Sequence, residues 1–189
     1  MNHAGYKATI NCKSLHDDIQ YEVGKEYSLE GMPLIHWQGF HYCNNPKNTL
    51  KYFSFNENFV LLEVQDLGDT VTDYYSSATN KIKILRKIDD IELQKLLNFK
   101  IKRTSFEFEV IGRFGFYIHK TFDKNNNLIS DEYRYNYFNE MHKARYKYDD
   151  LNREILYQTN QGFRQIYSYD ENNNRKLERT WHYNYPERF

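Results

Sequence analysis

The chain has 189 residues, of which 40% are hydrophobic and 17% aromatic, so it can form one large domain or two small ones and is too apolar for a disordered tail. Its 26 basic side chains balance its 26 acidic ones, so net charge does not draw it to nucleic acid or membrane. No apolar run approaches the roughly 20 residues of a membrane-spanning helix, and no charged-then-apolar leader opens the chain. We therefore expect a cytoplasmic protein with no membrane partner.

The cysteine and histidine content argues against both a disulfide scaffold and a metal centre. We expect the two cysteines, Cys12 and Cys43, to be reduced thiols, because nothing marks the chain as secreted. Together with His16, His36 and His41 they form the grouping that most suggests a metal, but they lack the paired spacing of zinc ligands. We expect no metal and no other cofactor.

The first half of the chain predicts short strands and a helix. Three segments have strand composition, at residues 6–10, 59–64 and 81–85. Asn45 in a capping position, followed by Pro46, predicts the start of a helix that runs to Phe53.

A second helix is predicted over residues 89–97, where Asp89 or Asp90 would cap it and suit the positive end of its dipole. Composition changes at this helix. Residues 1–98 carry ten basic and thirteen acidic side chains, whereas residues 99–189 carry sixteen and thirteen. The helix either closes the first domain or connects two domains, and we expect the division 1–88, a helical connector over 89–98, and 99–189.

A series of short motifs runs through the N-terminal part, at residues 5–8, 21–27, 39–43, 45–46, 68–69 and 79–84. Their order and sequence, which begin with Gly-Tyr-Lys-Ala and include Gly-Phe-His-Tyr-Cys, resemble a family of uncharacterised domains found in phage and prophage proteins. The family's usual cysteine before Gly-Phe-His is absent, and Ile35 and His36 stand there instead. This resemblance covers residues 5–88 and implies no established activity.

The succession of a strand, a Gly-Phe-aromatic turn, Asn-Pro and a helix also resembles the core of ADP-ribosyltransferase folds. That resemblance implies an NAD pocket bordered by His41 and Tyr42, with Lys7 where such folds carry a first-strand Arg or His. The late-strand glutamate of those enzymes has no convincing counterpart in this chain. An NAD-dependent, ADP-ribosyltransferase-like enzyme is therefore an alternative function.

Three segments of the second half share an aromatic-Asp step followed by asparagine, at residues 122–128, 148–154 and 169–175. They resemble the YD repeat of RHS-type proteins, which implies β-hairpins that stack through their aromatic residues. Asparagine tolerates a positive φ, and it replaces the repeat's glycine at Asn126, Asn152 and Asn173. We expect an antiparallel sheet of hairpins over 99–189, and a mostly β protein of the α+β class overall.

One predicted hairpin shows how the faces of that sheet would differ. Tyrosines alternate with polar residues on both sides of a turn at 139–142, at Tyr133, Tyr135, Tyr137, Tyr146 and Tyr148. Period two places the tyrosines on one face, where cross-strand pairs hold the hairpin, and the cations on the other. The residues that we expect to form a binding surface are Arg134, Lys143, Arg145, Lys147, Tyr135 and Tyr146.

Other features favour structural roles. Glu107 and Glu109 alternate with apolar residues, which indicates a half-exposed strand instead of a catalytic carboxylate pair. The segment 112–115 has two glycines without a phosphate-binding pattern and predicts a bend or bulge. Trp37 and Trp181 are expected to be core or interface anchors.

The preferred function is non-enzymatic binding to a larger host protein or ribonucleoprotein complex, because aromatic residues and arginine anchor such interfaces. One concrete form, suggested by the phage-type context, is a counter-defence inhibitor of the anti-CRISPR kind. The alternatives are the NAD-dependent enzyme and an RNA-binding module that uses the cationic strip. The sequence assigns no catalytic residue, and it leaves the partner and the oligomeric state open.

Overall fold

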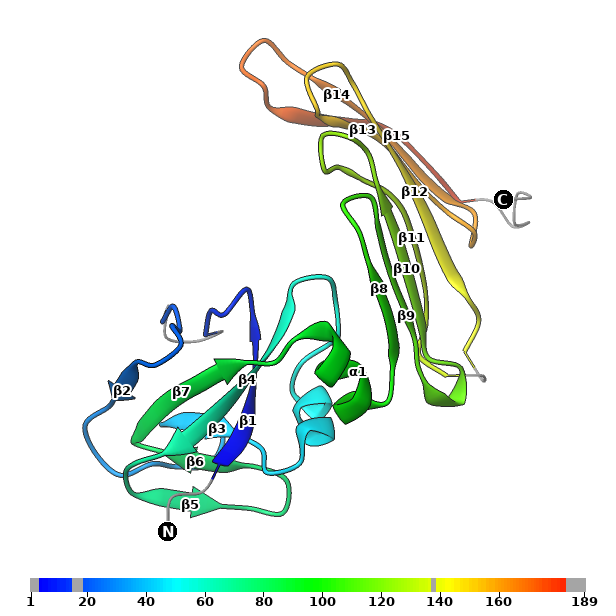
Figure 1. Ribbon diagram of the computed structural model, residues 1–189. Helices are drawn as coiled ribbons and strands as arrows, with labels where there is room; N and C mark the ends of the chain where they lie inside the picture. Colours follow the sequence, from blue (N-terminus) through cyan, green and yellow to red (C-terminus); the bar gives the residue numbers. More distant parts are fainter. Residues whose placement is uncertain (1–3, 15–18, 137–138, 183–189) are drawn as a thin grey trace. The chain divides into compact units, whose positions relative to one another are not determined.

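The computed structural model describes residues 4–14, 19–136 and 139–182. The chain divides into two compact units, Met1–Asn98 and Phe99–Phe189 (Figure 1). Both units are built from antiparallel sheets with few helices, so the prediction of a mostly β protein is confirmed.

The N-terminal unit contains two antiparallel sheets. The larger sheet has four strands in the order β1 (Ala4–Ile10), β4 (Phe59–Asp66), β7 (Lys81–Lys87) and β2 (Glu26–Ser28). The smaller sheet has three strands in the order β3 (Phe40–Tyr42), β6 (Ser77–Thr79) and β5 (Thr70–Thr72). The predicted strands correspond to β1, β4 and β7, while the four three-residue strands were not predicted.

Two short helices complete this unit, and both begin at capping residues. Asn45 caps η1 (Pro46–Lys51) by accepting a hydrogen bond from the Lys47 amide, although η1 is a 3-10 helix and shorter than predicted. The cap of α1 (Asp90–Leu97) is Asp89, which accepts from the Glu92 amide. Side-chain acceptors at these positions satisfy amides that the helix itself leaves unpaired.

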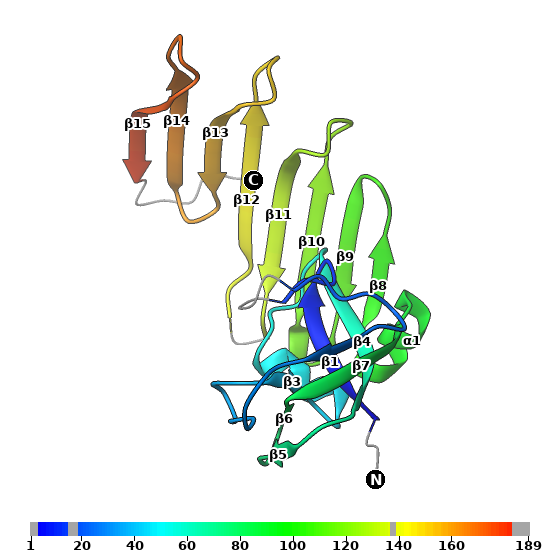
Figure 2. The ribbon, with the colours of Figure 1, turned by 90° about the vertical axis from the view of Figure 1, so that its left-hand side faces the viewer.

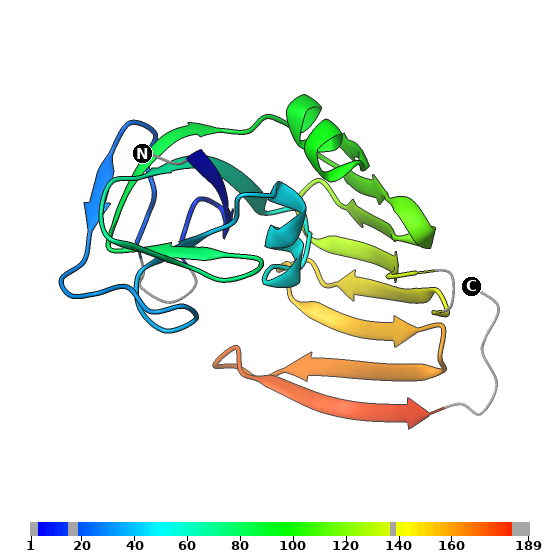
Figure 3. The same ribbon diagram turned by 90° about the horizontal axis from the view of Figure 1, so that it is seen from below.

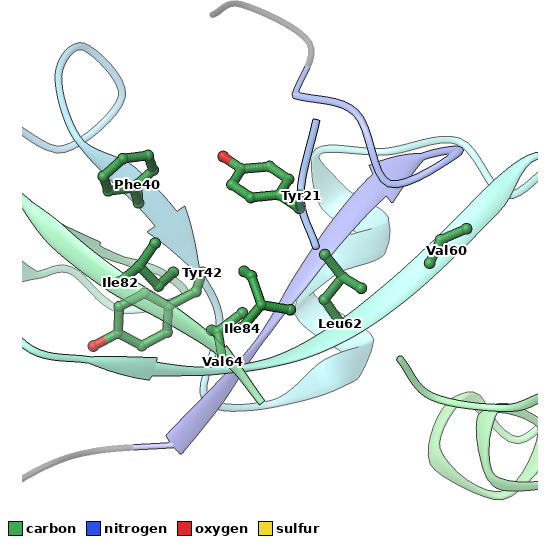
Figure 4. Packing of buried hydrophobic residues seen from close by; sticks show 8 residues of the cluster. All are labelled: Tyr21, Phe40, Tyr42, Val60, Leu62, Val64, Ile82 and Ile84. Atoms are coloured by element: carbon green, nitrogen blue, oxygen red, sulfur yellow. The ribbon is translucent and has the colours of Figure 1, made fainter. Parts of the chain in front are cut away.

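The core of the N-terminal unit forms where the apolar face of β4 and β7 meets β3. Alternation along β4 directs Val60, Leu62 and Val64 to this face, and Figure 4 shows them beside Ile82 and Ile84 of β7. The rings that complete the same cluster are Tyr21, Phe40 and Tyr42. This packing fixes β3 beside β1, and the two strands are joined by a bridge between Tyr6 and Cys43.

The C-terminal unit is one antiparallel sheet in which each strand pairs with the next along the chain (Figures 2 and 3). Its eight strands are β8 (Lys100–Arg103), β9 (Glu107–Ile111), β10 (Tyr117–Phe122), β11 (Leu128–Arg134), β12 (His142–Tyr148), β13 (Glu154–Thr159), β14 (Phe163–Tyr169) and β15 (Arg175–His182). The predicted bend lies at η2 (Arg113–Gly115). Within residues 99–136 and 139–182 there is no second layer of strands.

Three connections of this sheet have the same geometry. The asparagines Asn126, Asn152 and Asn173 have φ values of 65°, 60° and 65°, which confirms the predicted positive φ. In each turn an aspartate oxygen accepts hydrogen bonds from the amides two and four residues later, at Asp123, Asp149 and Asp170. These bonds make each turn locally determined.

The hairpin of β11 and β12 departs from the prediction. His142, expected in the turn, is the first residue of β12 and lies opposite Tyr133, with ring centroids 4.5 Å apart. Tyr146 finds its ring partner on the following strand, where it lies 5.3 Å from Tyr157. The pairing of aromatic rings extends across successive hairpins, because an inner strand of the sheet has a neighbouring strand on each side. Tyr137 and His16 lie outside the described residues.

Candidate functional site

The register of β11 and β12 separates the predicted binding residues between two faces of the sheet. Lys143 lies opposite Glu132 and Arg145 opposite Ser130, so the cations of β12 project from one face. Tyr146, between Arg145 and Lys147 in sequence, projects from the other face with Tyr157. The six predicted residues therefore belong to two surfaces.

The side chains of Lys143 and Arg134, two of the four predicted cations, contact groups of the C-terminal unit itself. The Lys143 ammonium lies 3.4 Å from the Glu132 carboxylate, and the Arg134 Nε donates to the Gly115 carbonyl at 3.1 Å. Arg145 and Lys147 are exposed. Among these four residues, the two exposed ones are therefore Arg145 and Lys147, which both lie on β12.

Arg145 and Lys147 instead belong to a basic face that extends over β12–β15. Strand register aligns two rows of side chains across these four strands on the same face. The first row is Arg145, Gln158, Arg164 and Trp181. The second row is Lys147, Leu156, Ile166 and Arg179. We call these eight residues the basic face.

The basic face combines four cations with an apolar centre. Leu156 is buried and Ile166 half-buried, so their positions between Lys147 and Arg179 give the second row an apolar middle. In the first row the Arg164 guanidinium lies 5.4 Å from the Trp181 ring centroid, a cation-π distance. The Arg164 Nε is buried and has no hydrogen-bond partner among the described residues.

Sequence reasoning missed Arg164, Arg179 and Trp181 as members of this face. The available signal was period two, since Arg164 and Ile166 alternate with Phe163 and Gln165. Trp181 is half-buried beside Arg164, so it serves neither as a core residue nor as an exposed ring.

The opposite face carries the aromatic ladder of the sheet. Ring contacts link Tyr146 to Tyr157, Tyr157 to Phe163 and Phe163 to His182, with centroids 5.3, 5.9 and 4.8 Å apart. Tyr135, which is 59% exposed, contacts Tyr133 at 5.4 Å. The contacts between neighbouring strands, from Tyr146 to His182, stabilise the single layer by cross-strand pairing.

A separate pocket of about 660 Å³ lies in the N-terminal unit. Its lining includes the three residues of the alternative NAD site, Lys7, His41 and Tyr42. Lys7 comes from β1 and the other two from β3, which the Tyr6–Cys43 bridge holds beside β1. The structure therefore brings together residues that lie more than 30 positions apart in sequence.

The polar groups of Lys7 and His41 form hydrogen bonds with other residues of the pocket wall. The Lys7 Nζ donates to the His41 carbonyl at 3.0 Å, and the His41 Nε2 accepts from the His36 amide at 2.9 Å. Burial lowers the pKa of His41 below its usual 6.5, and the Lys7 charge lowers it further. A neutral imidazole whose Nε2 is already an acceptor is a poor general base.

Two further groups that line the pocket, the Cys43 thiol and the Tyr42 hydroxyl, are protonated at neutral pH. Burial raises the pKa of the Cys43 thiol to about 11, and the charge of Asp73 adds to this effect. Burial and the hydrogen bond that its hydroxyl donates to Asp66 raise the pKa of Tyr42 to about 12. Such groups suit recognition better than nucleophilic catalysis.

Two smaller predictions concern Trp37 at the pocket and the two cysteines of this unit. Trp37 lines the pocket but is 89% exposed, so it is not a core residue, and its role as an interface anchor stays a prediction. Cys12 and Cys43 are thiols, as predicted. Across residues 4–14, 19–136 and 139–182, no group of three or more His, Cys, Asp or Glu side chains is arranged to hold a metal ion.

The fold and these sites define a mostly β protein with a pocketed α+β unit and a sheet unit that bears a basic face. Residues 4–97 match the family model DUF7666, a domain of unknown function. No curated protein and no solved structure matches the chain. The phage context and the YD-repeat resemblance stay predictions. No helix within the described ranges is long and apolar enough to cross a membrane.

Proposed function

We propose that the protein is a non-enzymatic binding protein that docks on a larger host protein or ribonucleoprotein complex. The observation that carries this proposal is the basic face of β12–β15, where four cations surround Leu156 and Ile166 and a tryptophan. Arg and Trp are enriched among residues that dominate interface energies, and an apolar centre within a polar rim is the usual anatomy of an interface.

The charge of this face favours a partner with an acidic surface. Two carboxylates near it are engaged, Glu132 with Lys143 and Glu178 with Lys176 at 3.3 Å. The exposed charge of the two rows is therefore positive, although the whole chain is neutral. A host assembly with a clustered negative patch would meet complementary charge on this face. An inhibitor of the anti-CRISPR kind is one form of this proposal.

The test compares two double variants with the same change of charge. Lys147→Glu with Arg179→Glu reverses two exposed cations of the basic face, and Lys100→Glu with Lys124→Glu reverses two exposed cations outside it. Full-length protein captures partners from nuclease-treated and untreated lysate, and each recovered partner is then titrated against both variants. We expect the first pair to weaken binding at least about tenfold and the control pair to leave it nearly unchanged.

Each other outcome of this experiment counts against docking on a protein surface. Equal effects of the two variant pairs would show that the basic face is not the contact. Binding to protein-free RNA, with an affinity that falls steeply as salt rises, would establish the RNA-binding alternative in its place.

The second candidate is the ADP-ribosyltransferase-like enzyme, which the common pocket of Lys7, His41 and Tyr42 favours. Incubation with labelled NAD and host lysate tests it directly. Label that appears on protein or nucleic acid, and disappears in His41→Ala, would overturn the non-enzymatic proposal. We expect no transfer, because the His41 Nε2 already accepts a hydrogen bond from the His36 amide and the buried Cys43 thiol is protonated at neutral pH.

A further inference from the structure

The sheet of the C-terminal unit ends in two edge strands, β8 and β15. β15 has eight residues, of which seven are exposed. It pairs with β14 on one side, and no strand within residues 99–136 and 139–182 pairs with its other side. An edge of this kind pairs readily with a further strand unless charge or geometry prevents it.

Charge opposes self-pairing at β8 and favours it at β15. β8 contains Lys100, Lys102 and Arg103 among its four residues, so two copies of it side by side would bring cations together. In β15, Glu178 precedes Arg179. Two antiparallel copies of β15 centred between these two residues place Glu178 of each copy opposite Arg179 of the other. This edge is therefore complementary to itself in charge.

The other pairs of this register bring no two carboxylates and no two lysine or arginine side chains together. They are Lys176 with Trp181, Leu177 with Thr180, and Arg175 with His182. A lysine ammonium beside a tryptophan ring is a favourable cation-π pair. The whole length of β15 is thus compatible with this register.

Pairing with β14 determines which backbone groups of β15 point outward. At the start of this hairpin the Asp170 amide donates to the Asn174 carbonyl at 3.2 Å, so these two residues form a hydrogen-bonded pair. Antiparallel pairs alternate between hydrogen-bonded and non-hydrogen-bonded ones. The N–H and C=O groups of Arg175 and Leu177 therefore point away from β14.

A β-bulge shifts this alternation in the middle of β15. The partners of Leu177 and Arg179 are consecutive residues of β14, which makes Glu178 the extra residue. Beyond the bulge the outward groups belong to Thr180 and His182. The outward positions are therefore symmetric about the step from Glu178 to Arg179. A regular strand, whose outward residues recur at every second position, does not match this spacing, whereas a second β15 does.

The two charged residues at the centre of this register lie on the same face of the sheet. The Ser168 hydroxyl donates to the Glu178 carboxylate at 2.5 Å, and Arg179 lies opposite Ile166. Ser168 and Ile166 are two positions apart on β14, so they share a face. Glu178 of one copy and Arg179 of another would thus meet on the basic face.

We propose that two copies of this chain pair through the outer edges of β15, antiparallel and centred between Glu178 and Arg179. The two sheets then continue into one another, and both basic faces lie on the same side, because opposite residues of an antiparallel pair share a face. This proposal goes beyond docking by the basic face. It is measured on purified protein without a host component, so its failure leaves the docking proposal standing.

The experiment exchanges the two central charges and measures self-association. Glu178→Arg and Arg179→Glu each place like charges opposite one another in a homodimer. In sedimentation equilibrium of the full-length protein over about 5–500 μM, each variant should weaken self-association at least about tenfold. An equal mixture of the two variants should form a heterodimer, because every central pair is again of opposite charge. The double variant, Glu178→Arg with Arg179→Glu, should recover the homodimer for the same reason.

Matched controls and a second readout locate the interface. Glu140→Arg and Lys100→Glu make the same charge changes at exposed positions outside β15 and should leave the dissociation constant unchanged. In the unaltered protein, the outward amides of Leu177 and Thr180 should exchange their hydrogens more slowly as concentration rises. The Lys176 amide, which pairs with β14, should exchange at the same rate throughout.

Three results would overturn the proposal. The first is a protein that stays monomeric over the whole concentration range. The second is a dimer in which the exchange of the Leu177 and Thr180 amides does not change with concentration. The third is a mixture of the two single variants that associates no better than either variant alone, since the register requires their charges to be complementary.

Discussion

The two units of the chain bury their apolar side chains in different ways. In the N-terminal unit β4 is almost entirely buried, and Leu62 and Val64 are 1% and 0% exposed between two sheets. In the C-terminal unit all seven residues of β14 are half-buried, because the sheet has one layer and its side chains cover one another. A closed core can enclose a pocket, whereas a single layer presents aligned rows of side chains to a partner.

The same substitution in the two units should separate these modes of burial most clearly. Ile82→Ala empties a fully buried site and should lower the free energy of unfolding by about 2–5 kcal/mol. Ile166→Ala removes a half-buried side chain and should cost about 1–2 kcal/mol. Native-state hydrogen exchange of β4 and β14 amides measures each unit. Equal losses would contradict the contrast between core and single layer.

A glycine in β1 tests how closely the two sheets of the N-terminal unit approach. A Cβ at Gly5 would overlap the Tyr42 ring, so Gly5→Ala must displace the ring whose hydroxyl donates to Asp66. We expect a loss of about 1–3 kcal/mol in urea unfolding. Gly24→Ala cannot serve as the control, because Gly24 has a φ of 87° and alanine would be strained there. The comparison in the C-terminal unit is Gly112→Ala, where an added Cβ would also meet close side-chain atoms.

The turns of the C-terminal unit should depend on backbone conformation more than on burial. Asn126 is exposed with a φ of 65°, so Asn126→Val should cost about 1–2 kcal/mol, whereas Asn126→Gly should be neutral or slightly stabilising. Thermal unfolding of both variants measures the difference. If valine and glycine behaved alike, the positive φ at this turn would be wrong.

His41 is expected to make the stability of the N-terminal unit depend on pH just below neutrality. The pKa of His41 is lowered in the folded state, so below its usual value of 6.5 the unfolded chain binds more protons and the unit loses stability. The loss should begin as pH falls through 6.5 and stop growing below the lowered pKa. Hydrogen exchange of β3 amides across this range, compared with His41→Gln, measures it. A variant with an unchanged pH profile would exclude His41 as the source.

Local features of this fold could be read from the sequence, and long-range ones could not. Capping by Asn45 and Asp89 and the positive φ of Asn152 depend on a few neighbouring atoms, so residue type was sufficient. The partner of Tyr146 depends on a third strand, and the row that joins Arg164 to Trp181 depends on the register of β14 and β15. Short strands such as β3 contain too few residues to show a period.

The candidate sites also depend on long-range contacts that the sequence does not show. Lys7, His41 and Tyr42 were singled out through a resemblance, and only the Tyr6–Cys43 bridge explains why they share a pocket.

Site-specific photo-crosslinking tests docking by the basic face most directly. A benzoylphenylalanine at position 181 would lie on the basic face, and one at position 157 would lie on the aromatic face opposite. With the partner recovered from lysate, we predict crosslinks from position 181 and none from position 157. Crosslinks from position 157 alone, or from neither position in a complex that still forms, would contradict docking by the basic face.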